Sequence, residues 1–285
     1  MILQIPNLRE ILLAQPGLMT IGVTVVLFVA FNLILGFLMV FKGIKNKNRT
    51  VIYIGMIFFA GATCWGGVVF NFFYILILNS FPDWIWFAFF LIMGGFLFIF
   101  HFFWIMGISN LTSIKGKQRI WFLIILGVVV AGLEGSYWVI LLTNIGLFST
   151  KLQFPFIPTY SYIGYFYLTV SLSFFTIGGS WIAIESYKSQ DPRLRLKSKF
   201  LIIYVIGITI GSLLEIYNII ESILIPLYGI SLLNASIIAS YTAKIILTIS
   251  VICGYIGFML PKRIERLFLK TKTKESVNVK PTLQE

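Results

Sequence analysis

The sequence predicts an all-α integral membrane protein: a seven-helix bundle with its N-terminus outside and its C-terminus in the cytoplasm. The first observation is composition, since 59% of the 285 residues are hydrophobic and only 11% are charged. The second is that the apolar residues form runs of about 20 or more, the length that an α-helix needs to cross a bilayer. The third is that Lys and Arg are concentrated in alternate connections between these runs, which sets the orientation.

Seven segments are long and apolar enough to span a membrane. They are residues 18–41, 51–78, 84–109, 120–143, 160–187, 200–224 and 235–260. The chain therefore divides into an extracytoplasmic N-terminal segment (1–17), the helical domain (18–260) and a basic cytoplasmic tail (261–285). Because the number of spans is odd, the two termini lie on opposite sides.

The basic residues fix which side is which. Of the 22 Lys and Arg, all but Arg9, Lys151 and Lys244 lie in residues 42–49, 115–119, 188–199 and 262–280. The positive-inside rule places these segments in the cytoplasm. The net charge of +12 thus lies at the membrane surface, where it meets anionic lipid, and does not predict nucleic-acid binding. We expect a multi-pass protein of the cell membrane, with the lipid bilayer as its first partner.

Motifs for catalysis, metal binding and cofactors are absent from the sequence. There is no HExxH, GxSxG or Walker pattern, and a single His cannot supply an organised catalytic triad or a metal site. We therefore predict that the protein is not an enzyme and needs no metal or cofactor. Cys64 and Cys253 both fall within spans, and we interpret them as small core residues.

Five ionisable residues fall within the spans, where charge is costly and usually functional: His101, Glu134, Glu215, Glu221 and Lys244. At about 1.5 Å per residue from the cytoplasmic ends, Glu134 lies roughly 21 Å deep, Glu215 roughly 23 Å and Lys244 roughly 24 Å. The three therefore share one layer in the outer half of the bilayer. An opposite charge within about 4–6 Å stabilises both ionised forms, so we expect Lys244 to pair with Glu215 or Glu134.

Three interpretations of Lys244 remain open at this point. Its stem could snorkel to the outer interface, it could form a purely structural ion pair, or it could contact a ligand, an ion or a proton. His101 lies nearer the cytoplasmic end of its span, and we interpret it as a hydrogen-bonded side chain between helices rather than a ligand or proton relay.

The segments outside the spans carry further predictions. The outer connections around residues 144–159 and 225–234 are apolar and contain Pro, so they either fold over the outer mouth of the bundle or dip into the headgroup layer. The first part of the tail places Ile264, Leu267 and Phe268 on one face with basic residues opposite. This pattern predicts a short helix lying on the inner leaflet.

The segment SYTAK, Ser240 to Lys244, resembles the retinal-binding lysine segment in the seventh helix of microbial rhodopsins. In that family an Asp usually stands four positions before the Lys, where this chain has Ser240. The third helix of the family supplies an Arg and a carboxylate, and residues 84–109 contain neither. A retinal Schiff base at Lys244 would need Glu215 or Glu134 as its counterion, and a retinal-binding photoreceptor is retained as a minor alternative.

A longer resemblance covers residues 20–260 and involves CWGG (64–67), TYSYIGYFYL (159–168) and DPRLRLKSKFLIIYVIGITIGSLLE (191–215). These segments look like the N-terminal seven-helix sensor region of histidine kinases. The resemblance implies detection of a ligand or of the membrane state, with a helix movement passed to the cytoplasm. About 25 residues follow the last span, without the phosphoacceptor His or ATP-binding domain of that family. If the resemblance holds, we expect either a sensor without its own output, which would act through a cytoplasmic signalling partner, or a relative with another role.

We accordingly predict a receptor-like protein that binds an unidentified small molecule in the outer half of the bundle. The expected ligand-binding residues are Lys244, Glu215, Glu134, Asn218, Tyr241 and Tyr217. A ligand with a carboxylate would compete for Lys244, weaken its pairing with Glu215 and let the last two spans shift. The cytoplasmic ends of these spans, with Arg195, Lys197, Lys262 and Arg263, would present the shift to the partner.

The alternative function is a secondary transporter or proton-coupled carrier that uses the same charged residues. Transport needs a polar path to both faces, whereas a receptor needs only an outer pocket. An apolar plug of Phe and Ile between the charged layer and the cytoplasm would favour the receptor.

Overall fold

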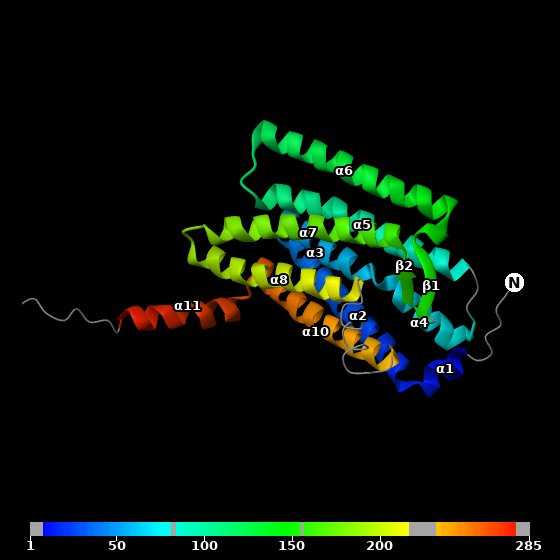
Figure 1. Ribbon diagram of the computed structural model, residues 1–285. Coiled ribbons are helices and arrows are strands. Elements are labelled where there is room, and N and C mark those ends of the chain that lie inside the picture. The colour runs from blue at the N-terminus through cyan, green and yellow to red at the C-terminus, as the bar shows by residue number, and fades with distance from the viewer. Residues whose placement is uncertain (1–7, 81–83, 155–156, 217–231, 278–285) are drawn as a thin grey trace, which may run out of the picture.

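A computed structural model shows an elongated bundle of helices (Figure 1). The structure describes residues 8–80, 84–154, 157–216 and 232–277. Within them the elements are α1 (Leu8–Ala14), α2 (Pro16–Lys45), α3 (Arg49–Thr63), α4 (Gly66–Leu78), α5 (Trp84–Leu111), α6 (Gly116–Thr143), η1 (Ile145–Leu147), β1 (Ser149–Phe154), β2 (Ile157–Tyr160), α7 (Tyr162–Tyr187), α8 (Pro192–Ile216), α10 (Leu232–Met259) and α11 (Lys262–Val277).

Six helices in the described ranges are long and apolar enough to cross a membrane, namely α2, α5, α6, α7, α8 and α10. The pair α3 and α4 also passes this test if the two are taken as one bent span, which would bring the number to seven. The prediction of an all-α membrane bundle is therefore confirmed in its general form.

The second span differs from the prediction, because residues 51–78 do not form one continuous helix. The chain breaks at Cys64 and Trp65, and the axes of α3 and α4 differ by 43°. Gly66 and Gly67 follow the break, and glycine is among the poorest helix formers. Gly67 packs directly under the Phe89 ring of α5, which lies 2.6 Å from where a Cβ would stand. The break is thus held by packing that only a glycine permits.

Small residues set the closest helix contacts. Helices α8 and α10 pack against each other most extensively, with Gly207 against Ser250 and Gly211 against Leu247. Such small residues let helix backbones approach in lipid, where association depends on close packing. The remaining main contacts join α2 to α3, α3 to α5 and α7 to α8.

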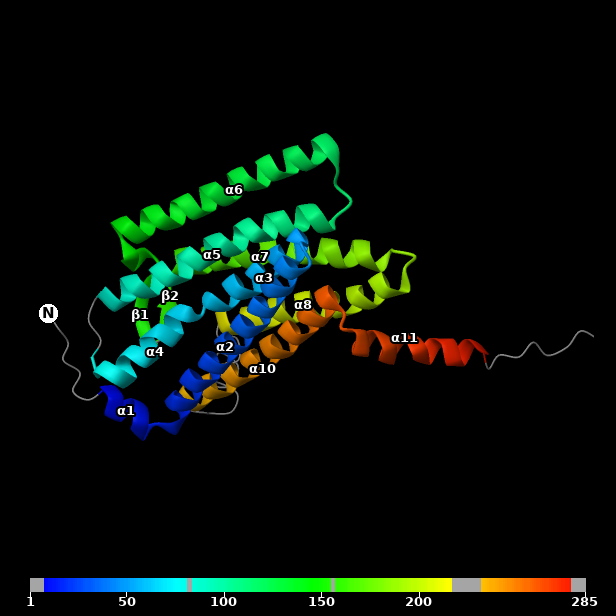
Figure 2. The ribbon, with the colours of Figure 1, turned by 180° about the vertical axis from the view of Figure 1, so that it is seen from behind.

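Helix α6 lies at the edge of the bundle, beside α5 in both views (Figures 1 and 2). Its outer face exposes large apolar side chains, among them Ile125, Val128 and Leu142. In a bilayer this face meets lipid.

A short antiparallel hairpin, β1 paired with β2, precedes α7 and adds a small strand pair to the helical fold. Just before it, Phe148 is 1% exposed and stacks on Phe90 of α5 at 5.7 Å between ring centroids. Tyr160 at its end enters the wall of a cavity. At these two residues the connection folds over the bundle, as the first of the two interpretations expects. The connection around residues 225–234 lies largely outside the described residues.

Helix α11 does not turn across the end of the bundle. It leaves the end that carries the α5–α6 and α7–α8 connections and points away from it (Figures 1 and 2). Two contacts attach it to α8: Arg193 pairs with Glu265 at 2.5 Å, and the rings of Phe200 and Phe268 lie 5.9 Å apart. These contacts join the start of α11 to α8, and its position on the inner leaflet stays a prediction.

Candidate functional site

Lys244 points into the bundle and pairs with Glu215. Its ammonium Nζ on α10 donates to the Glu215 carboxylate on α8, and the Lys244 side chain is 2% exposed while that of Glu215 is 28% exposed. The predicted pairing of Lys244 with Glu215 is confirmed, and the snorkelling interpretation is wrong. Helices α8 and α10 pack extensively on each other, and the opposite charges compensate each other across this contact.

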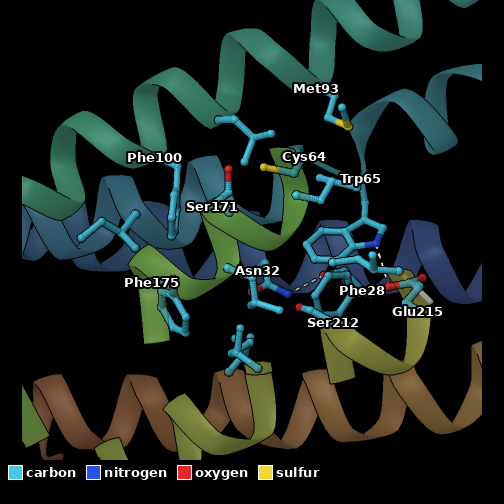
Figure 3. A pocket seen from close by; sticks show the side chains of 18 of the residues that line it. Phe28, Asn32, Cys64, Trp65, Met93, Phe100, Ser171, Phe175, Ser212 and Glu215 are labelled. Atoms are coloured by element: carbon cyan, nitrogen blue, oxygen red, sulfur yellow. Dashed lines mark hydrogen bonds between the residues drawn. The ribbon is translucent and has the colours of Figure 1, made fainter. Parts of the chain in front are cut away.

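Two aromatic rings complete the surroundings of the ammonium. The Lys244 Nζ lies 4.7 Å from the centre of the Trp65 ring and 5.2 Å from that of Phe28, within the range of cation–π attraction. Trp65 stands at the break between α3 and α4, and its indole Nε1 donates to the second carboxylate oxygen of Glu215 at 2.9 Å (Figure 3). One net-neutral cluster thus joins α2, the helix break, α8 and α10.

A cavity of about 180 Å³ lies beside this cluster. Its wall is mainly aromatic and aliphatic, with side chains such as Phe28, Phe100 and Met93 (Figure 3). Glu215 forms part of the wall, whereas Lys244 lies behind it and does not line the cavity. A molecule in the cavity would therefore meet the carboxylate and the indole before the ammonium.

A few polar groups interrupt the apolar wall. Asn32 is already bonded, since its Nδ2 donates to the Phe28 carbonyl one turn earlier at 2.8 Å. Ser171 on α7 is 6% exposed, and its hydroxyl has no hydrogen-bond partner in the described part of the chain. Figure 3 shows this hydroxyl among the side chains that surround the cavity. An unpaired buried hydroxyl on a cavity wall is suited to bind the polar group of a ligand.

An aromatic layer separates the cavity from the basic end of the bundle. Phe175 is central to it, with ring centroids 4.9 Å from Trp104 and 5.5 Å from Tyr204, and Tyr204 stacks on Phe58 at 5.6 Å. All four residues are at most 5% exposed. Phe58 lies roughly 13 Å along the helix from Arg49, which places the layer between the Glu215 cluster and the basic end. The barrier is made of Phe, Tyr and Trp rather than the expected Phe and Ile.

Glu134 does not join Lys244 and Glu215. Its Oε1 lies 2.6 Å from His101 Nδ1 on α5 and accepts a hydrogen bond of 3.0 Å from the Tyr167 hydroxyl on α7. Glu134 is predicted to share a layer with Lys244 and Glu215, but it contacts neither of them. The depth of a residue along its helix does not say which neighbouring helix it faces. Because α6 lies at the edge of the bundle, Glu134 faces α5 and α7. His101 is fully buried and hydrogen-bonded between helices, as its sequence interpretation expects.

The remaining predicted ligand residues are Tyr241, Asn218 and Tyr217. Tyr241 is 39% exposed and is not part of the cavity wall. Asn218 and Tyr217 lie outside the described residues. Among the described residues, no group of three His, Cys, Asp or Glu is placed to hold a metal ion.

The sequence interpretation missed Trp65 and Phe28. The signal that points to Trp65 is its position immediately before two glycines in an otherwise apolar span. Such a pattern indicates a broken helix, and broken helices in membrane proteins often border binding sites. Phe28 carries no comparable signal, because one Phe among 28 in the chain cannot be selected from sequence.

Comparisons with protein-family models and with curated proteins find no match for this chain. The resemblances to microbial rhodopsins and to histidine-kinase sensor regions therefore remain expectations.

Proposed function

We propose that the protein is a sensor or receptor that binds a small molecule in the cavity and relays a helix movement to the basic side. The observation that carries this proposal is the double role of Glu215. The same carboxylate lines the cavity and holds both Trp65 at the helix break and Lys244 on α10. A molecule that competes for this carboxylate changes the contacts among four helices.

The ligand proposed is uncharged and largely apolar. A ligand carboxylate would be repelled by Glu215 before it reached Lys244, and a ligand ammonium would bring a second cation next to Lys244. A hydroxyl meets neither difficulty, because it can accept from the unpaired Ser171 hydroxyl and can donate to the Glu215 carboxylate. Empty apolar cavities of about 150 Å³ bind molecules of benzene size, so a volume of about 180 Å³ suits a single substituted ring. This replaces the carboxylate ligand that the sequence suggested.

The proposed movement starts at Trp65. A polar group that takes one oxygen of Glu215 weakens the Trp65 bond and frees the break between α3 and α4 to change its angle. Because α3 packs on α2 and α5, the change reaches the basic ends of these helices. A ligand shifts such an equilibrium only by its difference in affinity for the two arrangements. The aromatic layer formed by Phe58, Trp104, Phe175 and Tyr204 favours a receptor over a carrier, since it interrupts a polar path.

The binding test uses four probes with one ring: toluene, benzyl alcohol, benzylammonium and benzoate. Binding is measured on the protein in lipid nanodiscs by ligand-detected NMR. We expect benzyl alcohol to bind best, and Gly61→Leu to weaken it at least tenfold by filling the cavity, which Gly61 lines. Gly132→Leu is the matched control, because open space surrounds Gly132 on the exposed face of α6. Equal binding to the wild type and both variants would contradict the proposed site.

The relay test measures the distance between spin labels at Lys45, at the basic end of α2, and Lys115, in the connection that follows α5. We expect benzyl alcohol to change the distance distribution in the wild type and not in Gly61→Leu. A proton or probe flux into liposomes that depends on Glu215 would instead support the carrier.

A further inference from the structure

A second buried site, between α5, α6 and α7, contributes no residue to the cavity wall. It consists of His101, Glu134 and Tyr167, joined through Glu134 Oε1 at 2.6 and 3.0 Å. His101 is 0% exposed, Glu134 is 2% exposed and Tyr167 is 4% exposed. The second carboxylate oxygen of Glu134 and the Nε2 of His101 are buried and have no partner within the described residues.

The charge of this cluster is decided by its surroundings. Among the described residues, the titratable groups that face Glu134 are His101 on α5, Tyr137 on its own helix, Tyr167 on α7 and Cys64 just after α3. None of these is Lys or Arg. A neutral imidazole beside an ionised carboxylate would therefore leave a net negative charge in an apolar interior, which is strongly unfavourable. One additional proton, shared between Nδ1 and Oε1, brings the cluster to zero net charge.

The position of α6 gives this proton a structural role. α6 packs on α5 through Tyr137, whose hydroxyl donates to the Phe90 carbonyl at 2.6 Å and whose ring fits against Gly94. α6 contacts α7 through side chains. Glu134 accepts a hydrogen bond from Tyr167, and the ring centroids lie 4.6 Å apart for Tyr137 and Tyr167 and 5.7 Å apart for Phe122 and Trp181. Glu134 is thus the polar link that fastens α6 to both neighbours.

We propose that His101, Glu134 and Tyr167 form a proton-binding site, and that the bound proton keeps α6 docked on α5 and α7. Loss of the proton leaves the carboxylate charge uncompensated. The charge is then relieved by hydration, which requires α6 to move away from its neighbours. This site is separate from the proposed ligand cavity and needs no ligand to act.

The test follows the distance between spin labels at Val128 on α6 and Ile177 on α7, both highly exposed side chains. The labels are introduced as cysteines in a protein whose Cys64 and Cys253 are alanine, and the distance is recorded in nanodiscs across a pH series. We expect α6 to separate as the pH rises. Because one proton is released on separation, the ratio of separated to docked protein should rise by about tenfold for each pH unit above the pH at which separation begins.

The Glu134→Gln variant is expected to stay docked at every pH, because an amide can bond His101 and Tyr167 but cannot ionise. Glu185→Gln is the matched control: Glu185 also links α7 to the region before α6, by accepting from the Ser113 amide at 2.9 Å, but it lies outside the cluster. It should keep the wild-type profile. Where Glu134→Gln does not fold, Glu134→Leu removes the charge without adding a polar group and should give the same flat profile.

A wild-type distance that does not change with pH overturns the proposal. So does a pH-dependent distance that Glu134→Gln or Glu134→Leu leaves unaltered, since the titrating group then lies elsewhere.

Discussion

Replacing the buried ammonium, Lys244→Met, is the most direct test of the site. Removing one partner of a buried ion pair costs about 3–5 kcal/mol. The remaining carboxylate of Glu215 is 28% exposed and keeps its bond from Trp65, so we expect Lys244→Met to lie near the lower end, about 3 kcal/mol. Glu215→Leu should cost more, about 5 kcal/mol, because the ammonium left behind is 2% exposed and, among the described residues, keeps the Phe28 and Trp65 rings as its neighbours.

The double variant Lys244→Met/Glu215→Leu distinguishes a paired charge from two independent defects. Replacement of a whole buried pair by apolar groups is often neutral or stabilising, and here only the Trp65 N–H loses its partner, at about 1–3 kcal/mol. The double variant should therefore be more stable than Glu215→Leu alone, with a coupling energy of at least about 3 kcal/mol.

The assay is reversible unfolding in mixed micelles, followed by circular dichroism. Lys188→Met, an exposed lysine in the α7–α8 connection, serves as the control and should change stability by less than about 0.5 kcal/mol. If both single substitutions fell within that range and their effects simply added, the argument for a buried ion pair would be refuted.

Two further predictions concern packing and orientation. Gly94→Ala should destabilise the protein by about 1–3 kcal/mol and so lower its thermal midpoint, because the added methyl group overlaps the Tyr137 ring. Gly95→Ala should be neutral or stabilising, because open space surrounds Gly95. A thermal melt of both variants checks this, and equal midpoints would contradict the packing described. A membrane-impermeant maleimide, applied to intact cells, should label Tyr162→Cys and not Lys45→Cys, because Tyr162 is 94% exposed and is predicted to lie outside, whereas Lys45 is predicted to lie in the cytoplasm. The reverse labelling pattern would show that the protein has the opposite orientation.

The sequence predicts that Lys244 pairs with Glu215 or Glu134, and two simple quantities point to the pair with Glu215. Their depths follow from helix rise, and the small residues Gly207 and Gly211 on α8 mark the face where another helix can approach closely. A buried ammonium requires an anion, so the nearest carboxylate of similar depth on such a face is its natural partner. The same reasoning predicts most of the span boundaries, which depend on hydrophobic length alone.

Glu134 shows what this reasoning lacks. Its depth is close to that of Glu215, but its partner depends on which helices surround α6, and hydrophobicity carries no information on that order. Side-chain direction adds to the error. Side chains on a helix lean toward its N-terminus, and α5 and α6 run antiparallel, so His101 and Glu134 reach toward each other from different levels. Depths counted in residues from the membrane surface therefore place His101 and Glu134 at different levels, although their side chains are in contact.

The two buried polar clusters differ in what can reach them, and this difference divides their proposed roles. Glu215 lines the cavity, so a ligand can compete for it, whereas Glu134 is closed off and can exchange only a proton. They are nevertheless close to each other through α7, because Tyr167 of the proton site stands one helical turn before Ser171 on the cavity wall. If a ligand that bonds Ser171 also favours docked α6, then by linkage protonation of the Glu134 cluster must raise the affinity for that ligand by the same factor. Benzyl alcohol titrations at several pH values measure one side of this relation, and the pH dependence of the α6–α7 distance with and without benzyl alcohol measures the other. An affinity that does not change with pH, together with a pH profile that benzyl alcohol does not shift, would show that the two sites act independently.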